Sequence, residues 1–139
     1  MSKGNTTEND IVKFLFNGTA MPSYGANLYL SLHTADPGEA GDQTTNEVIV
    51  GDYASYARIA VARDNTGFTV TGPSSVNAAL VQFPQCTGGA GATITHVGIG
   101  TSSSGAGQLL ASGALNASLT VSNLIQPQFA ASALTYTED

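Results

Sequence analysis

Two histidines, His33 and His96, are the side chains best suited to acid–base or metal chemistry near neutral pH. A site built on them requires both rings to converge with a carboxylate, and Asp36 is the only acidic residue close to either of them in the sequence. We therefore expect each imidazole to satisfy a backbone group at a strand end. The pattern predicts neither a catalytic nor a metal site.

Half of the acidic residues lie in one window, residues 36–52, and acidic clusters are candidate calcium sites. They are Asp36, Glu39, Asp42, Glu47 and Asp52. The run D-P-G-E-A-G-D lacks the alternating oxygen ligands of an EF-hand loop, which leaves an irregular calcium site and a solvated loop as the alternatives. In the second case the charges keep an otherwise neutral surface soluble.

No nucleophile has the sequence neighbours that catalysis requires. Cys86 is the only cysteine, which excludes an intrachain disulfide and a cysteine-based zinc site, and no histidine neighbours it. The chain has no G-x-S-x-G motif, and the glycine run at 88–91 is not followed by the Lys-Ser/Thr pair of a phosphate-binding loop. We expect a protein that is not an enzyme and holds no cofactor.

The charge balance excludes two classes of partner. The net charge is −6 with only four basic residues, so no basic stripe exists to neutralise the phosphates of a nucleic acid. No apolar run approaches the roughly 20 residues that span a bilayer, and the first residues lack a signal-peptide pattern, so we expect no membrane partner and synthesis in the cytoplasm. Only 10% of the residues are charged, which favours fixed packing against other protein.

Five side chains are candidates for such a protein interface: Phe14, Phe16, Tyr53, Tyr56 and Arg58. Tyr and Arg are enriched at interfaces, and we place Tyr53, Tyr56 and Arg58 on strand positions facing away from the core. Ordinary cross-strand pairing is the alternative role for each of these three. The two phenylalanines point away from one another on a predicted helix, so that one covers the sheet and the other meets a neighbouring subunit.

That helix is predicted over residues 7–18. Ile11, Phe14 and Leu15 share one face, and Asn17-Gly18 supplies the glycine that commonly ends a helix. Residues 1–6 are small and polar, and we expect them to be flexible.

The rest of the chain predicts strands. Residues 27–34 alternate, with Leu28, Leu30 and Leu32 on the buried face, and the turn residues Asp36-Pro37-Gly38 follow. Residues 53–63 alternate in the same way. Shorter strands are expected at 68–71, 79–83, 93–100, 108–114, 117–122 and 128–137. About eight short strands favour one all-β domain over residues 1–139, an antiparallel, jelly-roll-like β-sandwich with one short N-terminal helix.

Several blocks in this order resemble a family of small bacteriophage virion proteins commonly labelled tail fibre proteins, to which capsid decoration or cement proteins are related. The blocks are L-Y-L-S-L-H-T-A-D-P-G-E at 28–39, N-E-V at 46–48, Y-A-S-Y-A-R-I-A-V at 53–61, F-P at 83–84, T-I-T-H-V-G-I at 93–99 and L-L-A-S-G-A-L at 109–115. The resemblance covers about residues 10–137. Such proteins often carry a tryptophan before the T-x-T-H block, where this chain has Gly91-Ala92.

The resemblance implies a structural role in the virion and offers no catalytic residues. Our leading expectation is a capsid decoration or cement subunit that stabilises the head and binds the major capsid protein and copies of itself as a homotrimer. The first alternative is a tail fibre or tail-tip component, in which this chain is a globular part because it has neither repeats nor coiled-coil heptads. The second is a glycan-binding β-sandwich that uses Tyr53 and Tyr56 beside the acidic loop.

Overall fold

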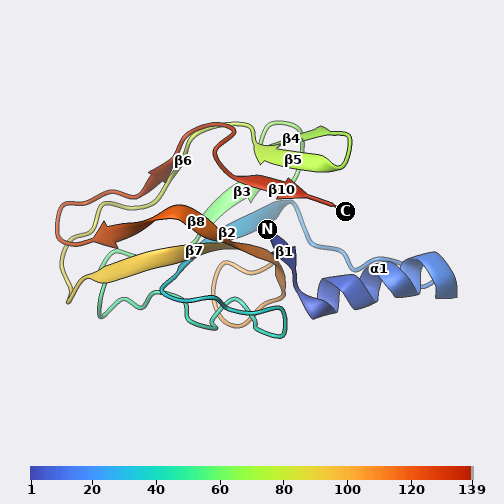
Figure 1. The fold of residues 1–139 in the computed structure, drawn as a ribbon, viewed down its shortest axis with the longest axis horizontal. Coiled ribbons are helices and arrows are strands. Elements are labelled where there is room, and N and C mark those ends of the chain that lie inside the picture. Colours follow the sequence, from blue (N-terminus) through green and yellow to red (C-terminus); the bar gives the residue numbers. More distant parts are fainter. Residues whose placement is uncertain (139) are drawn as a thin grey trace.

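Five antiparallel strands form the main sheet of the computed structural model, which describes residues 1–138 (Figure 1). Their spatial order is β1, β8, β7, β2 and β3. The bounds are Ser2–Lys3 for β1, Leu109–Val121 for β8, Ala92–Gly100 for β7, Asn27–His33 for β2 and Ile59–Ala62 for β3. The two long strands β7 and β8 and the leucine strand β2 form the centre of this sheet.

Two smaller antiparallel sheets complete the fold. One has the order β10, β5 and β4, and the other pairs β6 with β9. The bounds are Phe68–Thr71 for β4, Ser74–Asn77 for β5, Val81–Gln82 for β6, Gln128–Phe129 for β9 and Thr135–Thr137 for β10. The prediction of an all-β fold is confirmed, with ten strands in the described part instead of about eight. No helix among residues 1–138 is long and apolar enough to span a membrane.

The leucine strand β2 is buried on both faces at its C-terminal end. Leu30 and Leu32 are fully buried on one face, as predicted, but Ser31 and His33 on the other face are also fully buried. The acidic window covers this face, since His33 Nδ1 lies 2.9 Å from the carbonyl of Thr45. The window also pairs with the edge of the strand, through Val48 N–H to the carbonyl of Leu32 at 2.9 Å. The expectation of a half-buried strand is therefore wrong there, since a loop supplies a second cover that alternation does not reveal.

The predicted turn after β2 is present. Asp36 Oδ1 accepts a hydrogen bond from Gly38 N–H at 2.8 Å, which is an Asx turn, and Gly38 has a φ of 69°. The window that follows is an ordered loop whose Asn46 carbonyl accepts from Thr34 N–H at 2.9 Å.

The N-terminus is part of the sheet, which corrects the expectation of a flexible segment at 1–6. In β1, Ser2 and Lys3 pair with Ser112 and Ala111 of β8. A side chain at Gly4 would lie 2.3 Å from the carbonyl oxygen of Leu109, so only glycine lets the chain pass β8 this closely. Backbone hydrogen bonds to an ordered strand hold these small polar residues in place.

The second predicted strand is shorter than expected. It begins at Ile59, whereas residues 53–55 form a turn, with Tyr56 N–H bonded to the carbonyl of Tyr53 at 2.9 Å, and residues 56–58 are irregular. Because a turn does not alternate, the prediction of which side chains face outward fails in this segment.

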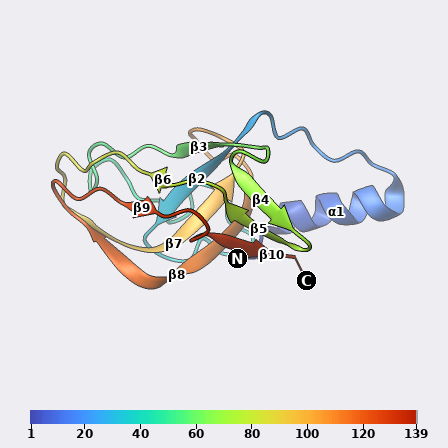
Figure 2. The same ribbon diagram turned by 90° about the horizontal axis from the view of Figure 1, so that it is seen from above.

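Helix α1, Asn5–Asn17, ends as predicted at Gly18, whose φ of 65° is left-handed. It begins two residues earlier than predicted, because the turn out of β1 at Gly4 already starts it. The helix projects beyond the sheets, and the chain returns from its far end to β2 (Figures 1 and 2). None of its residues is buried.

Candidate interaction site

Helix α1 carries a group of large apolar side chains that the rest of the fold leaves exposed. Val12, Leu15 and Phe16 are 55%, 64% and 80% exposed and lie on one side of the helix, which we name the α1 stripe. Phe14, 51% exposed, points to the other side. The expectation that one phenylalanine covers the sheet core is therefore wrong, because the helix leaves the sheets before it reaches either ring. Whether they form an interface stays a prediction.

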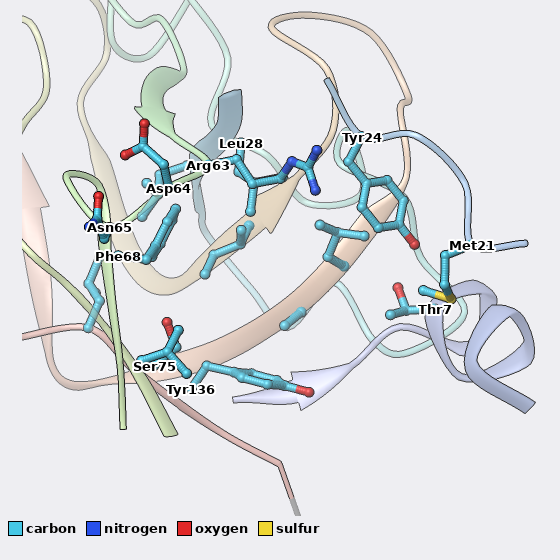
Figure 3. A pocket seen from close by; sticks show the side chains of 16 residues that line it. Thr7, Met21, Tyr24, Leu28, Arg63, Asp64, Asn65, Phe68, Ser75 and Tyr136 are labelled. Carbon is cyan, nitrogen blue, oxygen red and sulfur yellow. The ribbon is translucent and has the colours of Figure 1, made fainter. Parts of the chain in front are cut away.

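A cavity of about 620 Å³ lies between the main sheet and the three-stranded sheet (Figure 3). Its wall is apolar, with side chains from both sheets that include Leu28, Leu30, Ile99, Phe68 and Val70. Polar residues stand at its rim, and Figure 3 shows Arg63 and Tyr24 along one side with Tyr136 opposite. Sequence patterns predict the apolar strand faces but not the cavity, because the spacing of two sheets has no local signal.

Arg58 and Glu47 form a buried ion pair. Arg58 Nε and Nη2 donate to the two carboxylate oxygens of Glu47, each at 2.7 Å, and the two side chains are 3% and 12% exposed. Arg58 Nη1 and Nη2 also donate to the carbonyls of Ser102 and Gly105 at 2.8 and 2.7 Å. The guanidinium therefore joins the acidic window to the β7–β8 loop. It lies in the interior, whereas the sequence pattern predicted it on an outward strand face.

Tyr53 and Tyr56 also lie in the interior of the protein. Tyr56 Oη donates to Glu47 at 2.7 Å and accepts from Leu32 N–H at 3.1 Å, and its ring stacks on that of Phe83 with centroids 6.3 Å apart. Tyr53 is fully buried and its hydroxyl donates to the carbonyl of Pro84. Burial raises the pKa of both hydroxyls, that of Tyr53 to about 12. Neither ring is placed on an outward strand face, so the predicted placement is wrong for both.

The two histidines lie opposite one another on β2 and β7. His33 Nδ1 is 2.9 Å from the carbonyl of Thr45, which only accepts, so Nδ1 carries the hydrogen and Nε2 accepts from the Ser31 hydroxyl at 2.8 Å. His33 thus meets a backbone group as predicted, whereas His96 contacts the hydroxyl of Thr95 at 2.9 Å. Burial is the main cause that lowers the pKa of His33.

Three carboxylates of the acidic window, those of Asp36, Asp42 and Glu47, serve turns or the ion pair, and that of Glu39 accepts from the Ser2 hydroxyl at 2.6 Å. Asp42 Oδ1 accepts from the backbone N–H and the hydroxyl of Thr44 at 2.8 and 2.6 Å, and these bonds lower the pKa of Asp42. Within residues 1–138, no three side chains of His, Cys, Asp or Glu gather closely enough to hold a metal ion.

The α1 stripe is an exposed apolar patch of the kind that marks candidate contacts with other protein. The chain belongs to the family described as Podophage GP4 fiber I protein gp80, which it matches over residues 2–137. It is therefore a structural phage virion protein of the fibre type. No curated protein matches the chain.

Proposed function

We propose that this chain is a globular subunit of the phage tail fibre or tail tip. The match to a fibre protein family over residues 2–137 carries the proposal. That description names a fibre and no capsid, so it supports the tail hypothesis better than the capsid decoration hypothesis.

The exposed helix supports an assembly role. A subunit of a fibre must hold its neighbours through apolar surface, and the α1 stripe supplies such surface outside the sheets. Copies of the same chain are the partners that we propose. The expectation that three copies associate stays a prediction.

The glycan-binding hypothesis has lost its motivating observation. It required Tyr53 and Tyr56 to stand beside the acidic loop as exposed rings, whereas Tyr53 is fully buried and Tyr56 stacks on Phe83. We do not propose it.

Immunogold labelling of purified particles with antibodies against this chain tests the proposal. Gold at the tail fibres or tail tip is the expected result, and particles from a phage with the gene interrupted serve as the control without label. Gold spread over the head would overturn the tail proposal in favour of capsid decoration, with the major capsid protein as the partner.

A further inference from the structure

We infer that the α1 stripe of one copy of this chain docks into the inter-sheet cavity of a second copy. The inference rests on the proposed function only in that a fibre subunit must associate with its neighbours. Its test is done in solution, so it can fail while the particle labelling succeeds, and the reverse.

The helix requires a cover that its own subunit does not give. An isolated helix of 13 residues is marginal in water even when it is rich in alanine, and α1 is instead rich in Asn, Thr and β-branched residues. None of its residues is buried against the sheets. Helix α1 therefore gains most of its stability from packing in the assembly.

The cavity cannot be filled by the stripe of its own chain. Thr7, in the first turns of α1, lies on the cavity wall, and Phe16 lies about 13 Å farther along the helix at about 1.5 Å per residue. The helix points away from the sheets over this length (Figure 2). The end of the stripe at Phe16 is thus out of reach of its own cavity and is available to the body of a neighbour.

The surface areas match a specific interface. With about 175 Å² for each large side chain, the exposed parts of Val12, Leu15 and Phe16, the three residues of the α1 stripe, present about 350 Å². Covered by an equal area around the cavity, one helix buries about 700 Å², and two reciprocal contacts bury about 1,400 Å², which is within the range of a standard protein interface. The reciprocal arrangement is available because every copy carries both the helix and the cavity.

The cavity rim offers the cation of Arg63, next to the carboxylate of Asp64, to the end of a docked helix. The C-terminal end of a helix carries partial negative charge, and α1 has no basic side chain in its last turn. Arg63 stands at the cavity rim, where its Nε donates to the carbonyl of Gly25 at 2.7 Å, and a guanidinium has five N–H donors in all. Docking of Phe16 places the helix C-terminal carbonyls of one copy beside Arg63 of the other.

Disulfide trapping between two differently sized variants tests this docking. Phe16→Cys in one protein and Val70→Cys in a second, mass-tagged protein place thiols on the stripe and on the cavity wall. Both positions are highly exposed in the single subunit, at 80% and 70%, so the variants are expected to keep the wild-type thermal midpoint. Cys86 is fully buried and leaves the wild-type protein as an unreactive control.

Thr69→Cys supplies the matched control, since Thr69 is exposed on the same strand as Val70 but on its other face. After mild oxidation of mixtures, we expect Phe16→Cys to couple to Val70→Cys about a hundredfold faster than to Thr69→Cys, because docking raises the effective concentration of the thiols to the millimolar range. Equal rates for the two, or no coupling with either, would overturn the inference. Coupling of Phe16→Cys mainly to itself would also overturn it and would show that the helices pair with one another.

Discussion

At the scale of single residues, Arg58 shows what sequence reasoning finds and what it misses. Arg58 was expected at an interface with another protein, but its ion-pair partner is Glu47 of the same chain. The alternating pattern of residues 53–63 predicted an outward position, but residues 53–58 form a turn followed by irregular chain, which breaks that alternation. Nothing in the spacing of Glu47 and Arg58 indicates that a loop folds back to join them.

We predict that Arg58→Met lowers the free energy of unfolding by about 3 kcal/mol, because it leaves the Glu47 carboxylate buried without its cation. Urea unfolding followed by tyrosine fluorescence measures the loss. The double variant Glu47→Gln with Arg58→Met is expected to lose less than the two single variants together. Additive losses would contradict a coupled pair.

A second prediction concerns Gly100, the last residue of strand β7. A side chain at Gly100 would lie 2.1 Å from Cδ of Gln43, which is fully buried and bonds to Ser102. Gly100→Ala is therefore expected to lower the free energy of unfolding by about 2 kcal/mol through overpacking. Gly51→Ala is the matched control, since its nearest contact is an ordinary 3.6 Å, and an equal loss there would refute the explanation.

At the scale of elements, the sequence predicted the helix and the leucine strand well, because hydrophobic period and a terminal glycine are local signals. It did not predict that the acidic window, residues 36–52, covers the second face of β2. That cover depends on contacts between distant segments, such as His33 with the carbonyl of Thr45.

His33 makes the packing of the acidic window against β2 sensitive to pH. Burial lowers its pKa in the folded state below the ordinary value of about 6.5, so the unfolded chain binds the proton more readily. The contribution of neutral His33 to the free energy of unfolding is complete above about pH 6.5 and is lost as the pH falls below that value. The free energy of unfolding then changes by at most about 1.4 kcal/mol per pH unit for one proton. Glu47, Arg58 and His96 are the charged or titratable groups that act on this ring.

Urea unfolding at pH 7.5 and pH 5.0 checks this prediction. His33→Gln is expected to remove most of the pH dependence in this window, whereas His96→Gln keeps it. Asp42, Asp64 and Glu138 have lowered pKa values and therefore titrate below the window. A stability that stays constant in the wild type, or that changes equally in the His33 variant, would contradict the role of His33.

Truncation of a large side chain should have little effect on the free energy of unfolding in helix α1 and a large effect in strand β2. Phe16→Ala changes an 80% exposed ring, so the free energy of unfolding of the sheets should stay within about 0.5 kcal/mol of wild type in dilute solution. Leu30→Ala empties a fully buried site and is expected to cost about 2–5 kcal/mol. A large loss for Phe16→Ala at low protein concentration would show that α1 packs within its own subunit.

At the scale of the whole molecule, composition and the order of the sequence blocks led to the virion class, and the fibre family match agrees with it. The choice between head and tail had no sequence signal, because a small β-protein with few charges suits both places. The same holds for assembly, since the cavity and the exposed helix become visible only when the sheets are placed in space.

The central claim is that this chain is a fibre-type tail subunit held to its neighbours by α1. A cryo-electron microscopy map of the intact virion tests this claim most directly. We expect density for the β-sheets in the tail fibre or tail tip, with the helix of each copy buried against the next copy. Density on the capsid lattice, or tail density in which the helix stands free in solvent, would contradict it.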